Sequence, residues 1–128
     1  AQALDVPIAV GETIYDTYMF KEYIQHHGVD ILQADVTKLG GIDEWLEVAR
    51  LAAAHNLPVI PHTNVQQKIH VQLAAATEHV PMVEFCYESL AHIWKEPLTV
   101  ERGYYSLPQE PGAGCEPDPA ILKKFRVA

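Results

Sequence analysis

Four ionisable side chains stand at the ends of short apolar segments in this 128-residue chain. They are Glu12, Asp35, His62 and Glu84, and successive members lie 22 to 27 residues apart. A carboxylate such as Glu12 is a hard oxygen ligand for Mg²⁺, and His62 can act as a general acid or base near neutral pH. Asp35, placed beside His62, would fix the imidazole tautomer and stabilise the imidazolium.

This combination suits the removal of the α-proton of a carboxylate. That proton is a very weak acid, so the ene-diolate that forms must be stabilised electrostatically, and a divalent cation does that. Glu84, if protonated or bonded to a neighbour, could donate to a substrate oxygen. A single polar residue after a strand is more often a turn former or a helix cap. Four of them at matching positions favour a functional site.

The elements that must position these residues alternate along the chain. Strands are predicted at residues 6–10, 29–34, 57–60 and 82–83, and helices at residues 18–27, 44–55 and 68–76. Strand–helix alternation at this pitch means parallel strands joined by helical crossovers. A doubly wound sheet and a (β/α)₈ TIM-type barrel are the two candidates. In a barrel, the carboxyl ends of all strands point to one rim, where the four side chains would converge.

Chain length sets how much of a barrel is present. A full barrel takes roughly 250 residues, or about 31 per unit, so this chain holds about four units. Four strands cannot close such a barrel. They therefore leave one edge of the sheet open. We therefore expect an α/β fold in which residues 1–96 form the C-terminal half of a (β/α)₈ barrel. Residues 97–128, punctuated by prolines and glycines, are expected to be an extended, turn-rich C-terminal segment.

Helical periodicity predicts which side chains face the core. Asp43 is a candidate N-cap for the second helix. The core-facing side of that helix is predicted from three- and four-residue spacing to carry Trp45, Val48, Ala49 and Ala52. One face of the first helix is predicted to carry Met19, Tyr23 and Ile24.

Composition excludes several classes of function. The net charge is −8, from 17 acidic and 9 basic residues, and such a field repels nucleic acid. No apolar run reaches the roughly 18 residues that span a bilayer, so no membrane partner is expected. Two cysteines make no disulfide framework, which, with no visible secretory signal, favours a cytoplasmic setting. The chain begins Ala-Gln-Ala without an initiator Met, as a fragment or a processed chain would.

The motifs around the four residues resemble one family. The chain is similar, over essentially its whole length, to the C-terminal half of mandelate racemase-like members of the enolase superfamily. The matching motifs are Pro7-Ile8-Ala9-Val10-Gly11-Glu12, Asp30-Ile31-Leu32-Gln33-Ala34-Asp35 followed by Gly40-Gly41-Ile42, Pro58-Val59-Ile60-Pro61-His62, Met82-Val83-Glu84 and Pro111-Gly112-Ala113-Gly114. Their order, spacing and flanking residues together make the match specific.

The resemblance implies a role for each residue. Glu12 would be the third metal ligand, Asp35 the partner of the catalytic His62, and Glu84 the contact to the substrate carboxylate. It implies Mg²⁺-assisted dehydration of a sugar acid to a 2-keto-3-deoxy acid, with a racemase or epimerase as the alternative and a non-catalytic half-barrel as a third possibility. The family's first two metal carboxylates and its capping domain are absent from this sequence, so the chain alone is expected to be inactive.

Further expectations concern neighbouring residues and assembly. Thr63 and Asn64 are predicted to shape the loop after His62 or to touch substrate. Lys38 is expected at the surface, and Cys86 as a small buried hydrophobe. His70 has no partner that the sequence names. The full-length protein is expected to form a homo-oligomer, because a half-barrel edge favours association.

Overall fold

The computed structural model describes residues 1–63, 67–86, 90–107 and 109–127. Strands, helices and short 3₁₀ turns succeed one another along the chain. In order they are β1 (Ala9–Val10), α1 (Thr17–Gln25), β2 (Ile31–Leu32), α2 (Ile42–Ala54), α3 (Gln67–Ala76), η1 (Leu90–Ile93), β3 (Val100–Glu101), β4 (Tyr104–Tyr105), α4 (Pro119–Leu122) and η2 (Lys123–Phe125). Asn64 lies outside the described residues.

A small parallel layer confirms the predicted alternation of strands and helices. β1 pairs with β2 in parallel, with Ala9 opposite Ile31 and Val10 opposite Leu32. The third predicted strand joins through a single parallel bridge between Leu32 and Val59. Consecutive segments therefore lie side by side with their carboxyl ends at the same edge, as half of a (β/α) barrel requires.

The strands are shorter than predicted, and the segment at residues 82–83 is not a strand. Pro81 has no amide hydrogen to give to a ladder. The hydrogen bond that links the third segment to this region runs from the Val59 amide to the His79 carbonyl, at 3.0 Å, and residues 82–83 lie beyond it. Within the described residues the barrel is therefore open.

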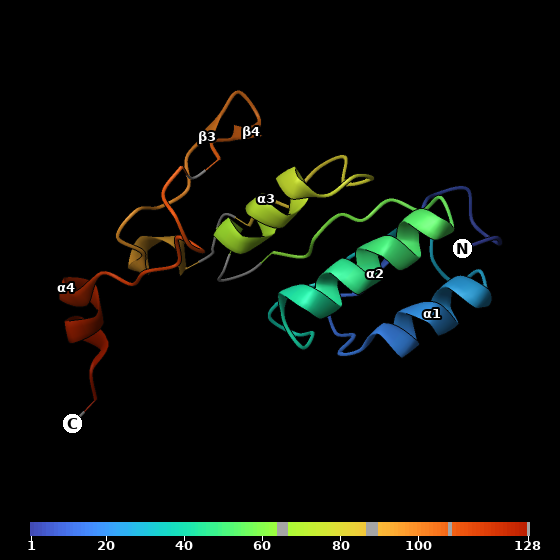
Figure 1. The fold of residues 1–128 in the computed structure, drawn as a ribbon, viewed down its shortest axis with the longest axis horizontal. Helices are drawn as coiled ribbons and strands as arrows, with labels where there is room; N and C mark the ends of the chain where they lie inside the picture. Colours follow the sequence, from blue (N-terminus) through green and yellow to red (C-terminus); the bar gives the residue numbers. More distant parts are fainter. Residues whose placement is uncertain (64–66, 87–89, 108, 128) are drawn as a thin grey trace.

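Two helices pack together and cover the parallel layer (Figure 1). α1 is capped by Asp16, whose carboxylate accepts the Met19 amide at 2.8 Å. Its buried side chains are Phe20 and Ile24, whereas Met19 is exposed. The prediction is confirmed for Ile24 and wrong for Met19 and Tyr23, which are both exposed. The spacing alone is ambiguous, because α1 carries aromatic residues around much of its circumference.

The second helix confirms its predicted core face. Its residues Trp45, Val48, Ala49 and Ala52 are all buried. The Trp45 ring is fully buried, and its indole N–H donates to the Ala34 carbonyl at 3.0 Å, which satisfies its polar atom. The predicted N-cap is wrong. Gly41 holds that position and Asp43 lies in the first turn, because α2 begins at Ile42.

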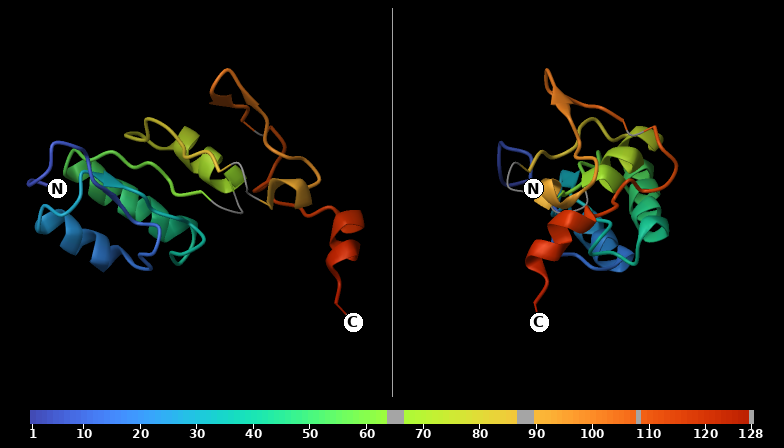
Figure 2. Two further views of the ribbon diagram at one scale, coloured as in Figure 1. Left: turned by 180° about the vertical axis from the view of Figure 1, so that it is seen from behind. Right: turned by 90° about the vertical axis from the view of Figure 1, so that its left-hand side faces the viewer.

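Within residues 97–127 the described chain holds regular elements besides the extended, turn-rich backbone that was expected. β3 and β4 form an antiparallel hairpin. α4 starts at Pro119 and is capped by Asp118, whose side chain accepts the Ala120 amide. Figure 2 shows this region reaching away from the helices of the first half. None of the described helices is long and apolar enough to cross a bilayer.

Candidate active site at the carboxyl ends of the parallel segments

Three of the predicted site residues lie just after the carboxyl ends of neighbouring parallel segments. Glu12 follows β1 by two residues, Asp35 follows β2 by three, and His62 follows Val59 by three. Gly11, between β1 and Glu12, is required by a close approach. A Cβ added there would lie 2.5 Å from the backbone of Gln33, and its φ of +154° also disfavours a side chain.

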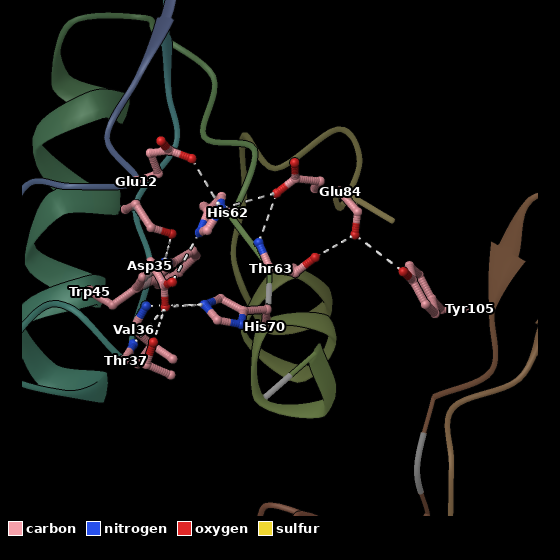
Figure 3. A network of polar contacts seen from close by, with 11 residues as sticks. Glu12, Asp35, Val36, Thr37, Trp45, His62, Thr63, His70, Glu84 and Tyr105 are labelled. Carbon is pink, nitrogen blue, oxygen red and sulfur yellow. Dashed lines mark hydrogen bonds and ion pairs between the residues drawn. The ribbon is translucent and has the colours of Figure 1, made fainter. Parts of the chain in front are cut away.

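His62 is the centre of the arrangement, and all three other predicted residues surround it (Figure 3). Its Nδ1 lies 3.0 Å from Asp35 Oδ2. An ionised carboxylate only accepts hydrogen bonds, so Nδ1 carries the proton. Nε2 faces the two glutamates, at 3.2 Å from Glu12 Oε2 and 4.0 Å from Glu84 Oε2. In the neutral imidazole Nε2 therefore holds the lone pair that can take a proton.

Burial divides the four residues into two pairs. The side chains of His62 and Asp35 are 16% and 1% exposed, whereas those of Glu12 and Glu84 are 63% and 37% exposed. The buried pair is fixed by its surroundings. The exposed pair forms the edge of the site that faces solvent, where a small molecule would enter.

Asp35 remains ionised despite its burial. Burial alone would raise the pKa of its carboxyl, but contacts with His70, Thr37 and His62 outweigh that effect and hold the pKa well below its ordinary value. Thr37 supplies two of them, because its amide and its hydroxyl both donate to Oδ1, at 2.8 and 2.7 Å. A permanent negative charge beside His62 Nδ1 would stabilise an imidazolium if Nε2 took up a proton.

Glu84 is held by Thr63 rather than by a strand ladder. The Thr63 amide donates to Glu84 Oε2 at 2.9 Å, and the Thr63 hydroxyl donates to the Glu84 carbonyl at 2.8 Å. The Tyr105 hydroxyl donates to the same carbonyl at 3.2 Å. Burial, together with the charges of Cys86 and Glu84, raises the pKa of Tyr105, so it stays a donor at neutral pH. Thr63 is buried, and its polar atoms position Glu84.

Sequence reasoning missed two partners of Asp35, namely Thr37 and His70. Thr37 had a local signal, because Asp followed two residues later by Thr favours a turn in which the carboxylate accepts nearby donors. His70 had no local signal, since its approach depends on how α3 packs. Of the other residues, Lys38 is exposed as predicted, and Cys86 is half-buried.

The donor set fits one ligand of a divalent cation, and not a complete site. The Glu12 carboxylate is exposed beside His62 and is a hard oxygen donor of the kind Mg²⁺ prefers. Among the residues that the structure describes, no group of three His, Cys, Asp or Glu side chains is arranged to hold a metal ion. Further ligands would have to come from outside this set.

Parallel strand–helix units with a His–Asp pair at their carboxyl ends define a half-barrel α/β domain with the geometry of a proton-transfer site. Residues 1–121 match the family model described as Enolase C-terminal domain-like. The chain belongs to that family, and its predicted resemblance to mandelate racemase-like members of the enolase superfamily is confirmed.

Three relatives illustrate the match. The chain is 29% identical over 131 residues to an arabinonate dehydratase of Saccharolobus solfataricus, covering 98% of this chain and 35% of that protein. It is 32% identical to an L-talarate dehydratase from Polaromonas sp. JS666, crystallised with Mg and L-glucarate, with a TM-score of 0.84 and coverage of 96% and 34%. A mandelate racemase/muconate lactonizing enzyme from the same organism shares 32% identity and a TM-score of 0.85, with coverage of 96% and 33%.

The relatives are much longer than this chain. It spans about a third of the length of the arabinonate dehydratase and of both crystal structures. Several relatives are named as sugar acid dehydratases of this superfamily. The half-barrel is therefore one part of the architecture found in the longer relatives.

Proposed function

We propose that the protein containing this chain removes the α-proton of a sugar acid and dehydrates it to a 2-keto-3-deoxy acid. The observation that carries the proposal is the placement of His62, with Nδ1 on Asp35 and Nε2 turned to the exposed glutamates. The named dehydratases among the relatives support the substrate class.

In this proposal His62 Nε2 takes the α-proton. The Nδ1–H bond to buried Asp35 keeps the lone pair on Nε2 and stabilises the resulting imidazolium. Nε2 is in contact with Glu12 at 3.2 Å, so that carboxylate must turn aside before substrate can approach. Glu12 is mostly exposed and has room to turn. Glu84, oriented by Thr63, is proposed to contact the substrate carboxylate.

We propose Mg²⁺ as the cofactor, with Glu12 as one ligand and the others supplied from outside this chain. Bound there, the cation would stabilise the negative charge that develops on the ene-diolate. A relative crystallised with Mg and L-glucarate supports this choice. Glu12→Gln is expected to weaken Mg²⁺ binding, measured by titration calorimetry on the full-length protein, and an unchanged affinity would remove Glu12 from the ligand set.

The proposal is tested on the full-length protein with Mg²⁺ and the sugar acids named for its relatives, including arabinonate, galactonate, xylonate and galactarate. A 2-keto acid product, detected with semicarbazide, is the expected result. His62→Asn should reduce exchange of the α-proton with deuterated water by at least about 100-fold. Full exchange in that variant would remove His62 from the role of base.

A racemase or epimerase is the second candidate, favoured by the mandelate racemase-like relative. It would use the same His–Asp pair but leave the β-hydroxyl in place. The same assay separates the two, because epimerisation incorporates solvent deuterium at the α-carbon and forms no 2-keto acid. Absence of both products across the panel would favour a non-catalytic half-barrel.

We also propose how the chain serves the longer architecture. Residues 1–96 would form the half-barrel, and residues 97–128 would return toward a capping domain outside this chain. The 128-residue chain alone is expected to be inactive, because it offers a single carboxylate ligand where a complete Mg²⁺ site needs more. Turnover of the panel by this chain at rates typical of enzymes would contradict that expectation.

A further inference from the structure

A buried histidine that is not among the four predicted site residues contacts the Asp35 carboxylate. His70, on α3, has no exposed surface. Its Nε2 lies 3.2 Å from Asp35 Oδ1 and 3.0 Å from the amide nitrogen of Val36, whose hydrogen points to it. Figure 3 shows the ring beside the Asp35 carboxylate and below His62.

We propose that His70 is a positioning residue for proton abstraction, which it serves by fixing the orientation of the Asp35 carboxylate toward His62. This inference rests on the proposed function, since it assigns His70 a part in the same reaction. The contacts of His70 that carry the proposal reach the Asp35 carboxylate and the Val36 amide, so we place its effect on the base through Asp35.

The two carboxylate oxygens of Asp35 have different partners. Oδ2 receives His62 Nδ1–H, whereas Oδ1 receives both donors of Thr37 and lies against His70. A carboxylate rotates readily about its Cβ–Cγ bond, because this torsion has broad minima. Rotation would carry Oδ2 away from His62. The partners of Oδ1 are therefore what keeps Oδ2 aligned.

His70 is the partner of Oδ1 that comes from another element. Thr37 lies two residues from Asp35 and moves with the same loop. His70 belongs to α3, the helix that follows His62 in the chain. From α3 it contacts the Asp35 carboxylate and accepts a hydrogen bond from the Val36 amide. It therefore ties the loop that carries the acid to the element next to the base, which local hydrogen bonds cannot do.

The ring can hold the Asp35–Val36 segment in either state of Nε2, through a different hydrogen bond in each state. Nε2 accepts the Val36 amide when it holds a lone pair and donates to Asp35 Oδ1 when it holds a proton, and the two cannot occur together. The Val36 amide hydrogen points to Nε2, and Asp35 Oδ1 lies 3.2 Å from the same atom, so both hydrogen bonds are within reach of the ring. In both states the ring edge occupies the same position between the Val36 amide and Oδ1. What the site requires is a polar atom at the place of Nε2.

Two polar substitutions separate this requirement from mere loss of a buried ring. In His70→Gln the side-chain amide reaches the place of Nε2, whereas in His70→Asn it ends near that of Nδ1. Leu73→Ala is the matched control, because Leu73 is a buried core residue on the same helix. The readouts on the full-length protein are kcat and KM for the best sugar acid of the panel, and the downfield proton signal of His62 Nδ1–H in NMR.

We expect His70→Asn to lower kcat by about 10- to 100-fold with little change in KM, as removal of an outer orienting partner typically does. The Nδ1–H signal should shift or broaden. His70→Gln and Leu73→Ala should keep both kcat and the signal near those of the parent. If His70→Asn does not fold, folded His70→Gln decides the matter, since loss of kcat and signal there overturns the proposal.

Three results would overturn the inference while leaving the proposed function intact. They are an unaltered kcat and NMR signal in His70→Asn, equal losses in the Asn and Gln variants, or an equal loss of kcat in Leu73→Ala. A different result, full α-proton exchange in His62→Asn, would instead refute the proposed function. The two failures are thus distinguishable within one set of variants.

Discussion

Residues 11–73 and residues 74–127 are packed in different ways, although both contribute to the site. Every buried residue of the described chain lies in the first region, whereas the second is half-buried or exposed throughout its described part. Asp35 and His62 belong to the first region and Glu84 to the second. The acid–base pair is therefore fixed by the core, and Glu84 depends on its bonds to Thr63 across the boundary.

The difference in packing corresponds to two different requirements of such a site. A base and its counterion need geometry fixed to within fractions of an ångström, and a close-packed surrounding supplies that. Residues that meet substrate and metal must open to solvent, and they gain their final arrangement from what binds them. Substitutions in each of the two regions test this division.

Asp35→Asn should have the largest effect. The amide would present a donor or a neutral acceptor to His62 Nδ1, which disturbs the tautomer and removes the counterion. In a comparable triad the loss is about 10⁴-fold in kcat, and we expect a loss approaching that in α-proton exchange. Asp43→Asn, the same change at an exposed position of α2, is the control. Comparable exchange rates in the two variants would break the assignment of the buried pair.

Trp45→Ala should be the most destabilising change in the core. The side chain is fully buried, and its N–H is satisfied by Ala34. Deleting a buried tryptophan typically costs about 3–5 kcal/mol of unfolding free energy. Urea unfolding of the chain measures the change. A loss below about 1 kcal/mol would mean that the first region is not the closely packed one.

Both residues show what the sequence could predict. Trp45 follows from helical spacing, and Asp35 from the alternation of strands and helices, because both signals are repeated along the chain. Part of the buried face of α1 and the cap of α2 were mispredicted, since α1 is aromatic on several sides and cap identity depends on where the helix starts. His70 could not be foreseen, because its contact with Asp35 joins positions 35 residues apart through tertiary packing.

The ionised state of Asp35 predicts a dependence of stability on acid. Its pKa is lowered in the folded protein, with contacts to His70, Thr37 and His62 outweighing burial. The unfolded chain therefore binds the proton first, near the ordinary value of 3.8. The stabilisation is complete above that pH and is lost as the pH falls toward the lower folded value. The slope should approach about 1.4 kcal/mol per pH unit for this one proton.

Unfolding measured between pH 2 and 7 tests the sign of this effect. Asp35→Asn should flatten the acid limb of the stability curve, whereas Asp43→Asn should leave it close to that of the parent. An acid limb that is equally steep in Asp35→Asn would mean that other carboxylates carry the dependence. The comparison of the two regions would then lose its electrostatic basis.

Thr63→Val should have a smaller effect, located at the boundary between the regions. The change removes the hydroxyl that donates to the Glu84 carbonyl. It keeps the hydrogen bond from the backbone amide of residue 63 to Glu84 Oε2. A net hydrogen bond is worth about 1 kcal/mol, so we expect KM to rise about fivefold. Thr63→Ser, which keeps the hydroxyl, should restore KM. A loss in kcat alone would place Thr63 with the acid–base pair instead.

Phe125→Ala should have the smallest effect, because the ring is 66% exposed in η2 and packs into no buried cluster of the described residues. Surface substitutions of this kind usually change stability by within about 0.5 kcal/mol. Urea unfolding of the 128-residue chain, compared directly with Trp45→Ala, measures the contrast between the two regions. A loss above about 1 kcal/mol would show that residues 74–127 contribute packing of their own, and would move the boundary of the stable core beyond Leu73.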